Sequence, residues 1–289
     1  MKTSAHDDVP RLSAGTLGNL FRCSHRLAGR LTEEQTGRRG TDPGMRLWSA
    51  LSNALRAAHD HAWDLSGPLE EAINDARLDA APEGLSVEES ALYRAAIGAY
   101  IDAFGDDEIA AVHPKAGEPL RRRVRTHPPF DMTGRADLLF AYDGRSPLVR
   151  RLSLRGSPDR RDAPTNAAVD THPDDTHPDD THADEEASIA DVALAVLLGL
   201  DRGPARNDVV LRSETLWLAG NGRVTHGRVT GADLSRFRSR LYIEVETAVT
   251  TPTPTPGWWC TSCERLARCP AVSSETPSVL LDRLSGSLP

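Results

Sequence analysis

The chain has 289 residues, which is enough for one large domain or two small ones with a sizeable buried core. Hydrophobic residues make up 39% and charged residues 26%, as in soluble globular proteins, and the longest apolar run is shorter than the roughly 18 residues of a membrane helix. The net charge of −8 comes from residues 170–186, which hold eight acids and no Lys or Arg, so the acidity does not exclude a nucleic-acid partner.

The N-terminal third is predicted to be helical. Residues 1–10 carry acids and a histidine but no apolar stretch, so we expect a disordered start, no secretory signal and a cytoplasmic protein. Ser13 is a predicted helix N-cap. Residues 43–61 and 87–104 each show one apolar stripe at helical spacing, and a capping-box pattern precedes the second.

After Pro114 the residue pattern changes from one typical of helices to one typical of strands. Residues 120–126 and 130–142 predict two strands, and the second ends at the hairpin signal Asp143-Gly144. Residues 148–154 then predict a partner strand, which gives a three-stranded meander.

Residues 157–187 are predicted to be a disordered acidic insert. They contain a Thr-His-Pro-Asp-Asp motif twice and a Thr-His-Ala-Asp-Glu variant, without apolar anchors. The alternative is loose binding of a divalent metal by the histidines and acids of the repeat.

The remainder alternates between helix and strand signals, so we expect a mixed α/β domain with appended helices. The expected order is a helix over 187–200, strands over 203–218 and 224–229 joined by an Asn-Gly turn, and a helix over 233–249. A Thr-Pro repeat over 251–256 then leads stiffly to the last cysteines.

Four cysteines predict a metal centre that joins both ends of the chain. Cys260, Cys263 and Cys269 form a Cys-x2-Cys-x5-Cys run, and Cys23 lies far upstream. Zinc and a [4Fe–4S] cluster both take four thiolates; the one-plus-three spread and the Pro after Cys269 favour the cluster, while four unligated thiols remain the plain alternative.

The chain resembles the RecB-like PD-(D/E)XK nucleases that carry an iron–sulfur staple, the group of the AddB nuclease domain and the CRISPR-associated RecB-like exonucleases. The resemblance rests on residues 12–23, on residues 259–270 and on Gly134-x-x-Asp137. It implies a restriction-endonuclease-like mixed sheet flanked by helices over residues 11–270, followed by a tail over 271–289. It also implies a [4Fe–4S] cluster on the four cysteines and Mg²⁺ or Mn²⁺ at Asp137.

Several positions depart from the family pattern. Ser153 stands where the second metal-binding acid is expected and Arg155 where the Lys is expected. Trp48 replaces the His of the early helix, and residues 191–195 lack the Gln and Tyr of a later helix. The resemblance therefore implies a degenerate nuclease centre whose remnants are Asp137 and Arg155.

Arginines near the predicted meander are candidates for phosphate contacts, because such contacts dominate nucleic-acid affinity. The candidates are Arg121, Arg123, Arg135 and Arg151. A solvated strand face in an Arg-rich protein is the equal alternative.

Three functions follow as hypotheses. The first is a catalytically degenerate protein that binds DNA and a [4Fe–4S] cluster in repair, recombination or phage defence, with a helicase or repair protein as a possible partner and no membrane. The second is an active Mg²⁺- or Mn²⁺-dependent exonuclease whose acids come from Asp159, Asp162 or the insert. The third is a regulatory protein that senses redox state or iron through the cluster.

Overall fold

The computed structural model describes most of the chain between Val9 and Ala271. The described residues are 9–32, 44–65, 67–75, 80–107, 110–142, 144–153, 187–218, 222–255, 260, 263 and 269–271. Arg155 and almost all of the predicted acidic insert lie outside them, as do the first eight residues and most of the predicted tail.

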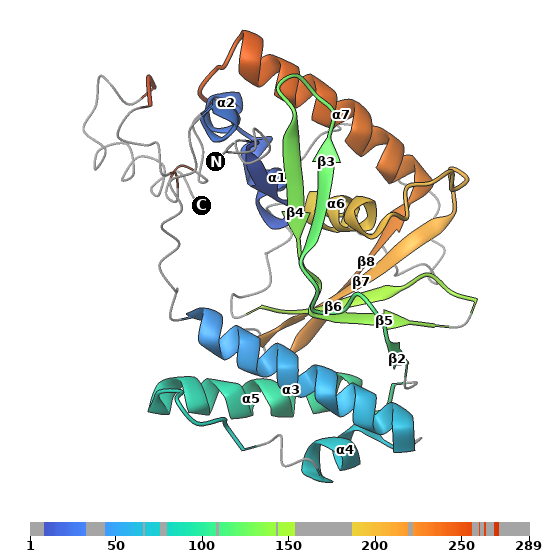
Figure 1. Ribbon diagram of the computed structural model, residues 1–289. Helices are drawn as coiled ribbons and strands as arrows, with labels where there is room; N and C mark the ends of the chain where they lie inside the picture. Colours follow the sequence, from blue (N-terminus) through green and yellow to red (C-terminus); the bar gives the residue numbers. More distant parts are fainter. Residues whose placement is uncertain are drawn as a thin grey trace, which may run out of the picture.

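Helices and strands alternate along the described chain in a mixed α/β arrangement (Figure 1). The helices are α1 (Ala14–Leu20), α2 (Ser24–Thr32), α3 (Gly44–Leu65), α4 (Leu69–Asp75), α5 (Val87–Phe104), α6 (Ile189–Leu198) and α7 (Gly231–Thr250). The strands are β1 (Arg11–Ser13), β2 (Ala111–Val112), β3 (Leu120–Val124), β4 (Phe130–Gly134), β5 (Leu138–Ala141), β6 (Leu148–Ser153), β7 (Val209–Trp217) and β8 (Arg223–Thr230).

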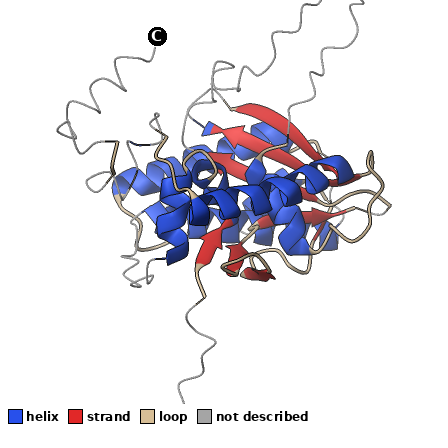
Figure 2. Ribbon diagram, turned by 90° about the horizontal axis from the view of Figure 1, so that it is seen from above, coloured by secondary structure: helices blue, strands red, loops and turns tan. Residues whose placement is uncertain are grey.

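The strands form two mixed sheets. Sheet A has the order β1-β4-β3, with β1 parallel to β4 and β3 antiparallel to it. Sheet B has the order β2-β5-β6-β7-β8, in which β6 and β7 are parallel and the other neighbours antiparallel. Helices lie over the strands when the molecule is seen from above (Figure 2).

Sheet B separates two hydrophobic cores because its side chains alternate between its faces. Leu139, Val149 and Leu211 point into the first core, which α1, α6, α7 and sheet A complete. Phe140 and Leu216 point into the second core, which α3, α4 and α5 complete. We call these three helices the helical lobe; it lies beneath sheet B in Figure 1, and α6 and α7 lie above the sheet.

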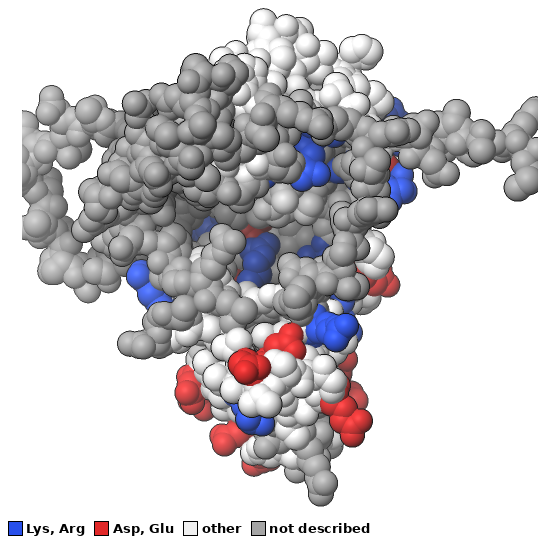
Figure 3. Space-filling view, turned by 90° about the vertical axis from the view of Figure 1, so that its left-hand side faces the viewer, with Lys and Arg blue, Asp and Glu red and all other residues white. Residues whose placement is uncertain are grey.

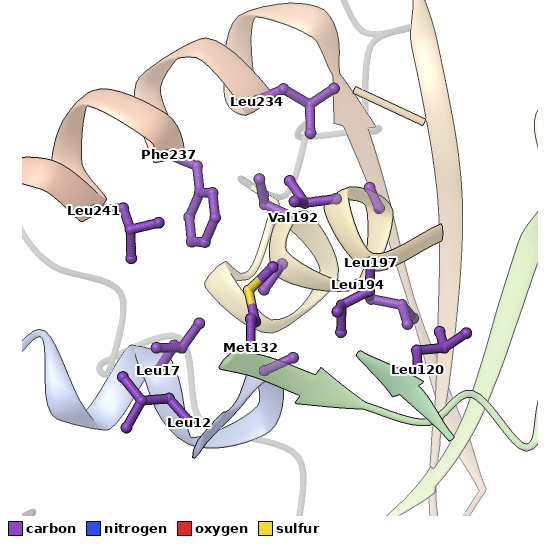
Figure 4. Packing of buried hydrophobic residues seen from close by; sticks show 14 of the residues in the cluster. Leu12, Leu17, Leu120, Met132, Val192, Leu194, Leu197, Leu234, Phe237 and Leu241 are labelled. Carbon is purple, nitrogen blue, oxygen red and sulfur yellow. The ribbon is translucent and has the colours of Figure 1, made fainter. Parts of the chain in front are cut away.

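The first core is centred on α6, whose eight residues from Asp191 to Leu198 are all buried. Leu234, Phe237 and Leu241 of α7 face α6 from one side, and Met132 of β4 faces it from another (Figure 4). Met132 has no exposed surface, so this packing fixes sheet A against α6.

The predicted helices are confirmed, and their ends follow capping chemistry. The Ser86 hydroxyl accepts a hydrogen bond from the backbone N–H of Glu89. The Glu89 carboxylate accepts one from the backbone N–H of Ser86, which completes the predicted capping box of α5. Ser13 is the N-cap of α1 but makes no side-chain capping bond. The helices α2 and α4 and the short strands β1 and β2 were not predicted from the sequence.

The predicted three-stranded meander is wrong. Residues 130–142 do not form one strand: β4 belongs to sheet A and β5 to sheet B, with a break at Arg135-Ala136-Asp137. A Cβ on Gly134 would lie 2.7 Å from Cδ1 of Leu197, so a larger residue at this position would require the Leu197 side chain to move. Within the described residues, no helix is long and apolar enough to cross a membrane.

Candidate functional site

Asp137 lies in the bend that carries the chain from sheet A to sheet B. Its carboxylate oxygen Oδ1 forms an ion pair with Nε of Arg135, without the alignment of a hydrogen bond. The two side chains are 36% and 47% exposed, so both reach solvent. The structure therefore places the two predicted residues together at an accessible surface.

The pairing of β5 with β6 shows which residues lie near Asp137. Leu138 pairs with Arg150 across the antiparallel strands β5 and β6. The pairing ends there, because Asp137 lies in the bend before β5, and Arg151 is the next residue of β6 after Arg150. Ser153, the predicted position of the second acid, lies two residues further along β6 and pairs with Trp217.

Arg151 forms an ion pair with Asp191, the third residue of α6. The Asp191 carboxylate is held on its other side, where Oδ2 accepts hydrogen bonds from Oγ of Ser188 at 2.7 Å and Oγ of Ser213 at 3.1 Å. In the sequence analysis, Asp191 was noted only because it occupies the position where the family pattern has a Gln. Its contact with Arg151 was missed because the two residues are 40 positions apart in the sequence, with the predicted acidic insert between them.

Gly227 leaves room for this arrangement on the neighbouring strand β8. A Cβ at position 227 would lie 2.7 Å from Ser213 Oγ and 4.0 Å from Asp191 Oδ2. We call the set Arg135, Asp137, Arg151 and Asp191 the paired-charge site. It consists of two ion pairs, Arg135–Asp137 and Arg151–Asp191, so its formal charge is zero.

The other two predicted DNA-binding residues lie elsewhere. Arg121 and Arg123 of β3 both donate to Asp131 of β4, with Nε–O distances of 2.8 and 2.6 Å. Burial alone would raise the pKa of Asp131, but the hydrogen bonds and charges of the two arginines outweigh it and hold the pKa below its ordinary value. These side chains alternate with residues of the first core along β3, so they lie on the outer face of sheet A, whereas Arg151 points towards α6.

Trp48 and His59 belong to the second core. Trp48 is half-buried against it, and His59 is 5% exposed, with its ring Nε2 2.9 Å from the Tyr100 hydroxyl. Burial, followed by the charge of Arg150, lowers the pKa of His59 to about 3. Both residues lie on the face of sheet B opposite the paired-charge site, so neither joins Asp137.

The four cysteines are all described, and none of them forms a disulfide bond with another described cysteine. Cys23 is buried between α1 and α2, and the next residue ties α2 to the segment after α7. Ser24 Oγ donates to the Thr253 carbonyl at 3.0 Å and accepts from the Thr253 N–H at 2.9 Å. Because seven residues span at most about 25 Å, this contact keeps Cys260 within reach of Cys23.

The four cysteines have the right chemistry for a thiolate-bound metal centre, but the described residues do not bring them together around one point. The ring Nε2 of His25, two residues after Cys23, is buried without a hydrogen-bond partner among the described residues. Cys260 and Cys263 share a turn through a 3.0 Å backbone hydrogen bond. Yet no group of three or more His, Cys, Asp or Glu in the described part of the chain is arranged to hold a metal ion.

On the side of the molecule shown in Figure 3, separate basic side chains lie near the middle, and several acidic side chains lie on the lower part.

Comparison with known proteins gives little further information. No protein-family model matches the chain, and no curated protein matches it. Six chains of solved structures match, among them one described as "Crystal structure of SSO0001", with 12% sequence identity and a TM-score of 0.35. The match covers 91% of this chain and 86% of that chain, but a TM-score this low carries no argument about fold or function.

Proposed function

We propose that the protein binds the phosphate backbone of DNA at the paired-charge site and does not hydrolyse it. The observation that carries the proposal is the partly exposed Arg151, which pairs with Asp191 and follows Arg150, the residue that pairs with Leu138 beside Asp137. Hydrolysis assisted by Mg²⁺ or Mn²⁺ needs several oxygen ligands around the metal, and a guanidinium among the carboxylates opposes cation binding. The same guanidinium suits a phosphate, which it can bind through two parallel hydrogen bonds.

The proposal includes the class of fold. Sheets A and B with their flanking helices are proposed as a PD-(D/E)XK-like core that has lost its catalytic acids, in line with the sequence resemblance. A role in DNA repair, recombination or defence against phage, with a helicase or repair protein as partner, follows from the resemblance alone.

DNA binding and cleavage are tested together on the full chain. Fluorescence anisotropy with labelled single- and double-stranded oligonucleotides is expected to show binding in EDTA that Mg²⁺ does not strengthen, with no cleavage on gels in Mg²⁺ or Mn²⁺. Arg151→Gln is expected to weaken binding and to lower the salt dependence by about one released counterion. Arg240→Gln is the matched control, since Arg240 is 50% exposed and pairs within α7.

Metal-dependent cleavage that disappears in Asp137→Ala would replace this proposal with the active-nuclease alternative. Absence of DNA binding at low salt would reject both. These two results separate loss of catalysis from loss of binding.

We further propose that Cys23, Cys260, Cys263 and Cys269 hold a [4Fe–4S] cluster that fastens α2 to the C-terminal segment. The support is the four cysteines without disulfide bonds, the Ser24–Thr253 contact between the two ends of the chain, and the buried ring Nε2 of His25 beside Cys23. Protein purified without oxygen is expected to absorb broadly near roughly 400 nm and to contain about four irons. About one zinc per chain would replace the cluster with a zinc site, and absence of both metals would reject either centre.

A further inference from the structure

We propose that Asp191 acts as an internal substitute for a phosphate: it holds the Arg151 guanidinium in the free protein, and a backbone phosphate of bound DNA displaces it. The inference rests on the proposed function and names the ligand and the internal competitor of the same site. Carboxylate and phosphate oxygens present similar anionic acceptors to a guanidinium, so the two compete for one side chain.

The exposure of the two partners makes the exchange accessible from solvent. The Arg151 side chain is 33% exposed, whereas the Asp191 side chain is only 8% exposed. Arg151 contacts Asp191 through Nη1, and a guanidinium carries five N–H donors in all. An incoming phosphate therefore meets Arg151 before it meets Asp191.

Asp191 remains supported when Arg151 leaves it. Ser188 and Ser213 both donate hydroxyl hydrogen bonds to its Oδ2. Asp191 also lies in the first turn of α6, where the helix dipole favours a negative charge. The exchange thus leaves no isolated buried carboxylate, which would otherwise make it prohibitively costly.

Asp201 shows the opposite arrangement and supplies the matched control. Its side chain is 1% exposed and pairs with both Arg122 and Arg238, which join β3 and α7 to the end of α6. Asp191→Asn and Asp201→Asn remove the same formal charge. Only the first removes a competitor for Arg151.

The experiment measures DNA affinity of the full chain by anisotropy for wild type and both variants. Asp191→Asn is expected to bind DNA about fivefold more tightly, since a partly exposed ion pair no longer has to break. Asp201→Asn is expected to match wild type, and Arg151→Gln in the Asp191→Asn background is expected to abolish the gain. Equal gains in the two Asn variants, or weaker binding by Asp191→Asn, would overturn the inference.

A second measurement uses wild-type protein and needs no stable variant of Asp191. The side-chain N–H resonance of Arg151, assigned by its absence in Arg151→Gln, is expected to move when a short oligonucleotide is added. A resonance that stays in place while DNA binds elsewhere overturns the inference and leaves DNA binding itself intact. Absence of DNA binding in both wild type and Asp191→Asn instead rejects the proposed function.

Discussion

Arg150 and Arg151 are consecutive residues of β6, and their side chains extend to opposite faces of sheet B. Arg150 is 3% exposed; its guanidinium lies 4.0 Å from the Phe104 ring centroid and pairs with Glu214, its neighbour on β7. Arg151 is 33% exposed and pairs with Asp191. The first arginine therefore ties the helical lobe to the sheet, and the second belongs to the surface that we assign to DNA.

Replacement of Arg150 is expected to be strongly destabilising. Arg150→Met leaves Glu214, which is 17% exposed, without its cation in a largely buried setting. We expect a loss of about 3–5 kcal/mol in the free energy of unfolding, measured with urea. Arg240→Met, which breaks an exposed pair within one helix, is the control and is expected to cost less than about 1 kcal/mol. Similar losses in the two variants would show that Arg150 does not join the lobe to the sheet.

His59 is expected to make the protein less stable as the pH falls. Its pKa is lowered to about 3 by burial and by Arg150, so the folded state keeps it neutral while the unfolded state takes up a proton below about pH 6.5. The free energy of unfolding therefore decreases from about pH 6.5 towards pH 3, by about 2 kcal/mol at pH 5.

The check is urea unfolding at pH 7.5 and pH 5 in wild type and His59→Gln, which should lose this part of the pH dependence. His61→Gln, two residues along the same helix at a partly exposed position, should keep it. A wild-type slope in His59→Gln would mean that His59 is not held neutral by the fold.

Gly227 and Gly98 form a matched pair for substitution by alanine. A Cβ at Gly227 would press against Ser213 Oγ at 2.7 Å, whereas a Cβ at Gly98 in α5 would meet nothing within 4 Å. Gly227→Ala is expected to destabilise by about 1–3 kcal/mol, and Gly98→Ala to stabilise by about 0.5–1 kcal/mol. Thermal unfolding measures both; a neutral Gly227→Ala would contradict the close contact between β8 and Ser213.

Ser24→Ala is expected to loosen the link between α2 and the segment after α7. It removes both hydrogen bonds to Thr253, at a cost of about 1–2 kcal/mol in the free energy of unfolding. Thr250→Ala removes only a bond within α7, to the Glu246 carbonyl, and is expected to be nearly neutral. Urea unfolding distinguishes them, and iron content after purification should fall in Ser24→Ala alone if the link supports the cluster.

Local sequence signals predicted the helices α1, α3, α5, α6 and α7, because each of these segments contains its own evidence, whereas α2 and α4 were missed. The Ser86–Glu89 box and the apolar stripe of α5 lie within one segment, and the structure confirms both. The separation of β4 from β5 could not be read in the same way. It depends on which strands each segment joins, since β4 pairs with β1 and β3 whereas β5 pairs with β2 and β6.

The candidate site shows the same division. Asp137, Arg135 and Arg151 stand out in the sequence as charged residues on strand-like segments. The ion pair between Arg151 and Asp191 depends on the packing of α6 across sheet B. The hydrogen bonds of Arg121 and Arg123 to Asp131 depend on the register of β3 and β4. The sequence contains the residues of these contacts but not the distances between them.

The pairing of β1 with β4, together with the Ser24–Thr253 contact, has a consequence for the order of folding. The helices of the helical lobe come from one continuous stretch, residues 44–104, so they can pack on one another early. The first core instead collects residues from Leu12 to Ala248. Because contacts between distant residues require long loops to close, the half of the molecule that carries the proposed DNA site should fold last, after α7 up to Ala248 has left the ribosome.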